Sequence, residues 1–165
     1  MTGVAALFAA LAAMLLLAAV AHDRVAYAPL RRALRAGALD ATPFGALKTW
    51  RGAGMAEHPE AVYRYVAYDV PPGTTAVVRG RLRPDARYFS IALYDRWLQT
   101  SIAAGPTYLS SRGLHTDADG GFVLVLAHAD PGVPWLDVSA APRGVLFERH
   151  LGGAPATPST LERRL

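Results

Sequence analysis

The chain contains no cysteine, and this absence removes several classes of site at once. Disulfides, thiolate nucleophiles and zinc sites with thiolate ligands all require that residue. The sequence also lacks the G-x-S-x-G, H-E-x-x-H, Walker and G-x-G-x-x-G patterns that mark common catalytic and nucleotide-binding sites. We therefore expect neither a metal ion nor a cofactor.

Charged residues are also scarce, at 18% of the 165 residues, in part because one long segment has none. Residues 4–21 contain no charge, proline or glycine. As a helix they would extend over about 27 Å, close to the hydrocarbon thickness of a bilayer. We predict a single-pass transmembrane anchor over residues 1–21. A secretory signal cleaved after Ala21 is the alternative, although the N-terminus lacks the usual Lys or Arg.

A basic segment follows this apolar run. Residues 22–51 contain six basic and two acidic residues, so the net charge of +4 for the whole chain arises there. We expect short juxtamembrane helices over residues 22–56, with Arg24, Arg31, Arg32 and Arg35 facing anionic lipid headgroups. A solvated helix face is the alternative, and the side of the membrane stays open. Because the rest of the chain is neutral, nucleic-acid binding is not expected.

Beyond residue 57 the pattern changes to the alternation typical of strands. Apolar and aromatic residues alternate or cluster in five segments, bounded by turn-forming Pro, Gly and Asp: 61–69, 75–83, 88–95, 121–128 and 143–151. Short strands separated by turns predict a mainly β fold, a jelly-roll-like antiparallel β-sandwich over residues 57–151. Residues 152–165 are rich in Pro, Gly, Ala and Thr, which predicts a flexible tail.

The stretch "HTDADGGFVLVLAHADPG" (115–132) has the appearance of an ion-binding loop. Asp117 and Asp119 precede two glycines, but no third ligand follows at the spacing of a calcium loop. Asp130 lies beyond the next strand. Asp-Gly before an apolar run instead predicts a turn that begins a strand.

Candidate ligand-binding residues lie at strand ends and on polar strand faces. They are Arg79, Tyr94, Asp95, Trp97, His128, Trp135 and Asp137. The aromatic members could line a cleft and Arg79 could hold an anionic group, but each also fits a core-covering or solvated role. Glu148 and His150 are two residues apart on one strand, so they could form an acid–base pair. The alternative is an edge strand with a polar outer face.

The stretches "EHPEAVYRYVAYDVPPGTTAVVRGRLRPDARYFSIALYD" and "DADGGFVLVLAHADPGVPWLDVSAAPRGVLFERHL" resemble the domain-of-unknown-function 1214 family, which often occurs beside its companion 1254. The resemblance covers residues 57–151. It implies a jelly-roll-like sandwich, often preceded by a membrane or export segment. The family has no established activity, so the resemblance implies no catalytic residue.

Together these features favour a membrane-anchored binding or accessory module of an envelope assembly, with a protein partner or a second copy of the chain. One alternative is a hydrolase or isomerase acting on a lipid or glycan through Asp95, Asp137, His128 or His150. Another is a secreted carbohydrate-binding domain released by cleavage after Ala21.

Overall fold

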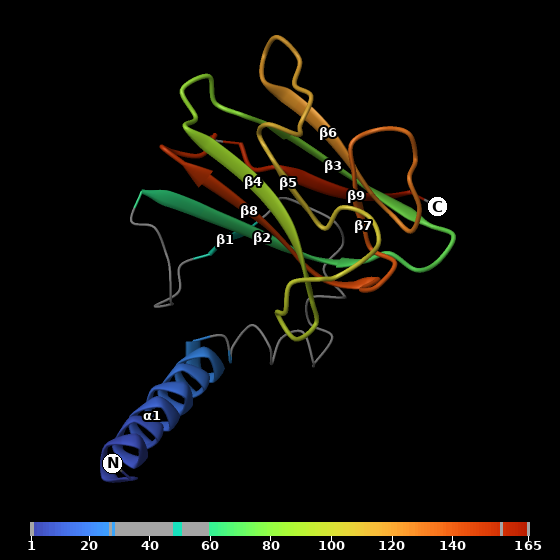
Figure 1. Ribbon diagram of the computed structural model, residues 1–165. Coiled ribbons are helices and arrows are strands. Elements are labelled where there is room, and N and C mark those ends of the chain that lie inside the picture. The colour runs from blue at the N-terminus through green and yellow to red at the C-terminus, as the bar shows by residue number, and fades with distance from the viewer. Residues whose placement is uncertain (1, 27, 29–47, 51–59, 156, 165) are drawn as a thin grey trace.

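The computed structural model describes residues 2–26, 28, 48–50, 60–155 and 157–164, which form one helix and two β-sheets (Figure 1). In chain order the elements are α1 (Thr2–Ala26), β1 (Lys48–Trp50), β2 (Ala61–Asp69), β3 (Thr75–Arg81), β4 (Tyr88–Asp95), β5 (Tyr108–Ser110), β6 (Gly121–Ala127), β7 (Trp135–Asp137), β8 (Arg143–Leu151) and β9 (Thr160–Arg164). The mainly β, sandwich-like fold predicted from the alternation is confirmed.

The two sheets have the strand orders β1-β2-β8-β4-β5 and β7-β6-β3-β9. All neighbouring pairs are antiparallel except β6 and β7, which run parallel. The expected antiparallel arrangement is therefore wrong for this one pair. Residues 128–134 double back beside β6, and the Val125 N–H donates to the Pro134 carbonyl at 3.0 Å before β7 begins.

The hydrophobic core lies between the sheets and receives side chains from both. Val66 of β2, Leu146 of β8 and Leu93 of β4 stand in one row across the five-stranded sheet. They belong to the same buried cluster as Val78 of β3 and Leu124 of β6 from the other sheet. The two-residue period of these strands thus places every second side chain, among them these apolar ones, on the face that the opposite sheet covers.

The stretch that begins at His115 forms a turn, as predicted. The Asp117 carboxylate accepts the backbone N–H groups of Asp119 and Gly121 at 2.9 and 2.7 Å. Gly120 has φ = 79°, a conformation that residues with a Cβ rarely adopt. Asp117 therefore closes the turn from which β6 starts.

The end of the chain differs from the predicted flexible tail. Strand β9 lies within residues 152–165 and is hydrogen-bonded to β3 along its whole length. Leu161 is fully buried among core side chains. Proline and glycine are confined to the connection before β9, and this is why composition alone suggests a loose segment.

The described residues cover only part of the N-terminal segment for which predictions were made. Helix α1 covers the apolar run and includes Arg24. Among the residues whose side chains are described, no helix combines the length and the apolar character needed to cross a bilayer. The juxtamembrane helices, with Arg31, Arg32 and Arg35, lie largely outside the described residues.

Candidate functional site

Three ionisable side chains are buried between the sheets, at one end of the core. They are Arg64 of β2 and Glu148 and His150 of β8, and we call them the buried polar cluster. Arg64 and Glu148 are register partners, in the same inward-facing series as Val66 and Leu146. The local alternation therefore directs these polar groups into the interior.

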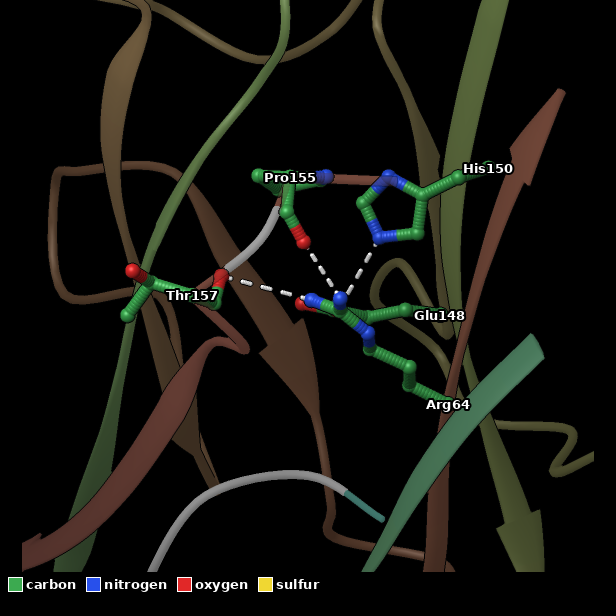
Figure 2. A network of polar contacts seen from close by, with 5 residues as sticks. All are labelled: Arg64, Glu148, His150, Pro155 and Thr157. Carbon is green, nitrogen blue, oxygen red and sulfur yellow. Dashed lines mark hydrogen bonds and ion pairs between the residues drawn. The ribbon is translucent and has the colours of Figure 1, made fainter. Parts of the chain in front are cut away.

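Hydrogen bonds connect the cluster to the chain segment before β9 (Figure 2). The Arg64 guanidinium donates to the carbonyl oxygens of Pro155 and Thr157 at 2.5 and 3.3 Å. His150 Nε2 lies 3.2 Å from Glu148 Oε2. Arg64 thus fastens the β8–β9 connection to the five-stranded sheet.

Some polar atoms of this region have no hydrogen-bond partner among the described residues. They are Arg64 Nε, Glu148 Oε1, His150 Nδ1 and Ser159 Oγ. Leaving such atoms buried and unpaired costs free energy. Ser159 lies so close to Gly80 that a Cβ there would stand 2.3 Å from its hydroxyl oxygen, and this explains why a glycine interrupts β3.

The Glu148–His150 pair has the composition of an acid–base pair but not the access. Both side chains have no exposed surface. The interpretation of β8 as an edge strand with a polar outer face is wrong, because β8 is the central strand and these residues face inward. A substrate cannot reach them without opening the sandwich, so the cluster is suited to holding the fold together.

Three of the predicted site residues lie near one another where β6 and β7 end. The Asp137 carboxylate accepts backbone N–H groups from Gly105 and Ser139, each at 2.8 Å. Burial by itself would raise the pKa of Asp137, but the Ser139 side chain, the two backbone N–H groups and the nearby His128 outweigh it and lower the pKa. A Cβ on Gly105 would stand 2.7 Å from the Trp135 ring, so a glycine allows the loop to pack here.

Two more predicted residues, Asp95 and Trp97, lie at the end of β4 and just after it. Asp95 accepts the backbone N–H groups of Trp97 and Gln99 at 2.8 and 2.9 Å and so closes a tight turn. Trp97 is 43% exposed and lies beneath the Arg96 guanidinium, with 5.1 Å between the ring centroid and the guanidinium carbon. Asp95 and Trp97 thus organise the loop that follows β4.

Tyr94 and Arg79 lie on the outer faces of different sheets. The Tyr94 ring meets Phe147 edge-on, with 5.3 Å between centroids, and burial raises the pKa of its hydroxyl. Arg79 faces solvent on β3, where Glu162 lies 3.8 Å away. The seven predicted residues therefore do not form a single site: His128, Trp135 and Asp137 cluster, and Arg79 stands apart.

Sequence reasoning missed Arg64, although a signal for it exists. Arg64 occupies the same alternate series of β2 as Val66 and Tyr68, both of which are buried. A charged residue in an inward-facing series indicates a polar group inside the fold. The partner segment at Pro155 and Thr157 gives no corresponding signal, because it supplies only backbone oxygens.

Comparison with known proteins supports the fold and leaves the function open. No family model matches the chain, and no curated protein matches it. A solved structure of an uncharacterised protein from Burkholderia cenocepacia is similar, with a TM-score of 0.63 and 19% identity over 72% of this chain and 34% of that one. The VPA0106 protein from Vibrio parahaemolyticus gives a TM-score of 0.54 and 18% identity over 68% of this chain and 33% of that one. The chain spans about a third of either structure.

Proposed function

We propose that this chain is a binding or accessory module, a jelly-roll-like sandwich of the domain-of-unknown-function 1214 type that α1 holds at a lipid bilayer as part of a larger envelope assembly. The observation that carries the proposal is the surface of α1. Met14, Leu15, Leu16 and Leu17 are consecutive, and each is 63–68% exposed. Four consecutive residues point to all sides of a helix, so no polar face is left for water.

The basic segment after α1 supports the same proposal. Arg24, Arg31, Arg32 and Arg35 follow the apolar run closely, where anionic headgroups would lie. Each basic residue near such a surface contributes about 1 kcal/mol of attraction. The neutral remainder of the chain leaves the sandwich free to meet a protein partner.

A catalytic role through the predicted residues is less well supported. Both oxygens of Asp137 already accept backbone N–H groups, and Asp95 Oδ1 accepts two. His128 Nε2 lies 2.8 Å from the Val70 carbonyl oxygen, and His150 is sealed inside the core. The described contacts of these four residues are thus with the protein's own backbone or core.

Membrane extraction tests the proposed attachment. We expect the chain to stay with the membrane fraction after an alkaline carbonate wash. Replacing Leu15 and Leu16 by lysine adds a penalty of about 6 kcal/mol to insertion and should release the chain. The matched control places the same two lysines at Val123 and Val133, which are exposed on the sandwich, and should leave attachment unchanged.

Two further measurements separate the alternatives. If the protein isolated from cells is fully soluble and begins at His22, the proposed membrane anchor is wrong. Because the chain has no cysteine, single Thr2→Cys and Ser111→Cys variants can be labelled with a membrane-impermeant maleimide. Labelling of the two positions from opposite sides indicates a crossing helix, and labelling from one side indicates a helix that lies in the interface.

A further inference from the structure

The outer face of the five-stranded sheet carries a cationic patch with hydroxyl groups around it. Arg149 of β8 lies between Glu148 and His150, both of which face inward, so its side chain points outward. Its register partners are Tyr63 on β2 and Ser90 on β4, and Ser90 in turn pairs with Ser110 on β5. The patch consists of Tyr88, Ser90, Tyr108, Ser110, Arg112 and Arg149, of which Ser90 is buried beneath its neighbours, and we call it the Arg149 face.

Aromatic rings hold the Arg149 guanidinium in place. Its central carbon lies 5.8 Å from the Tyr63 ring centroid and 6.0 Å from that of Tyr88. Its Nε is buried and donates to no described residue. Stacking therefore positions the guanidinium, and its terminal Nη groups, rather than the buried Nε, are the donors that face a ligand.

Arg149 and Arg112, like Arg81, lack the carboxylate partner that several arginines of the described sandwich have. Four arginines each pair with a carboxylate: Arg79 with Glu162, Arg83 with Asp85, Arg87 with Glu60 and Arg143 with Asp69. Within residues 60–155 and 157–164, no such ion pair includes Arg149 or Arg112. The two positive charges of this face are thus not neutralised by the described part of the protein.

Hydroxyl groups complete the set of donors. The hydroxyls of Tyr88 and Tyr108 are hydrogen-bonded to each other. That hydrogen bond is the main reason why the pKa of Tyr88 is lowered, and the nearby Arg149 and Arg112 lower it further. Both guanidinium groups therefore impose a positive potential on the Tyr88 hydroxyl, close to the Ser90 side chain.

From this arrangement we infer that the Arg149 face binds a phosphate group, carried by a lipid headgroup or by a soluble phosphorylated molecule. Guanidinium forks and hydroxyls supply donors from several directions, as the oxygens of a tetrahedral anion require. A neutral sugar would provide no negative charge to pair with the two guanidinium groups. This inference is independent of the proposed membrane attachment, because every residue in it belongs to the sandwich.

The test titrates the full chain in maltoside micelles, which contain no phosphate, at constant ionic strength. One arm adds inorganic phosphate and the other adds short-chain phosphatidic acid, with chloride as the reference anion. The readout is the Nε–Hε resonance of Arg149 in nuclear magnetic resonance spectra, assigned with Arg149→Lys. We expect a saturable shift in at least one arm, and the arm that responds identifies the source of the phosphate.

Variants then separate a built site from diffuse charge. Arg149→Gln should weaken phosphate binding about tenfold or more, because it removes charge-assisted hydrogen bonds. Arg81→Gln removes one exposed arginine from the opposite sheet and should change binding less than about twofold. Equal losses in the two variants, or no saturable shift of Arg149 in either arm, would overturn the inference. If Arg149→Gln fails to fold, the wild-type titration alone still tests the inference.

Discussion

Removal of Arg64 provides the sharpest test of the buried polar cluster. Its guanidinium is buried and donates to two carbonyl oxygens of the β8–β9 connection. Arg64→Met keeps most of the aliphatic stem but leaves both carbonyls without their donor and Glu148 without the facing cation. Leaving a carbonyl oxygen without its donor costs about 1–3 kcal/mol, so we expect the loss of both hydrogen bonds to cost about 3–5 kcal/mol, a large part of the stability of a small domain.

The measurement is urea unfolding of the chain in detergent, followed by tryptophan fluorescence and circular dichroism. Arg79→Met is the matched control, because Arg79 and Glu162 are 45% and 56% exposed and 3.8 Å apart. An exposed pair of this kind contributes at most about 1 kcal/mol. If the two variants lose similar amounts of unfolding free energy, the cluster does not stabilise the fold and the reasoning is wrong.

A double variant extends the test to the coupling within the cluster. Arg64→Met combined with Glu148→Met replaces both polar groups by apolar ones of similar size. The double variant still leaves the two carbonyls without their donor, but it no longer buries one charge without the other. We expect the double variant to lose less free energy than the sum of the single variants, by about 1–3 kcal/mol.

Three further predictions concern positions whose surroundings are equally specific. Gly144→Ala should cost about 2–4 kcal/mol of unfolding free energy in urea, because its Cβ would stand 2.0 Å from the Tyr94 carbonyl oxygen on a paired strand. Asp137→Asn should be destabilising at neutral pH, because the lowered pKa of Asp137 stabilises the fold above pH 3.8. Below that pH, acid protonates the folded carboxylate, so the difference in unfolding free energy between the variant and wild type should become smaller. A pH series of urea unfolding curves checks this, and a constant difference would contradict it. Asp117→Ala should cost about 1 kcal/mol in thermal unfolding through the lost turn hydrogen bonds, whereas Asp119→Ala should have little effect.

The parts of the fold that sequence could predict are those with strong local signals. The alternation of Phe89, Ile91 and Leu93 predicts strand β4, and the Asp-Gly sequence predicts the turn that Asp117 closes. Strand β9 was hidden, because only Leu161 of its side chains is buried and the flanking composition suggests a loop. Its place is decided by pairing with β3, which is a contact distant in sequence.

The candidate site was less accessible to prediction for the same reason. Sequence spacing shows that Glu148 and His150 share a face, but not which face, because a strand has two and only the tertiary structure decides between them. The central position of β8 makes this pair internal and turns Arg149 outward. The two-residue period of a strand thus identifies which side chains share a face, but it does not determine whether that face is buried or exposed.

The position of β8 also has a consequence for the kinetics of folding. It is inserted between β2 and β4, although five other strands separate it from β2 along the chain. Until β8 docks, β2 and β4 each present an unpaired edge, and the chain must close a long loop before either edge is protected. We therefore expect slow refolding at low protein concentration, and aggregation through those open edges when the concentration is raised.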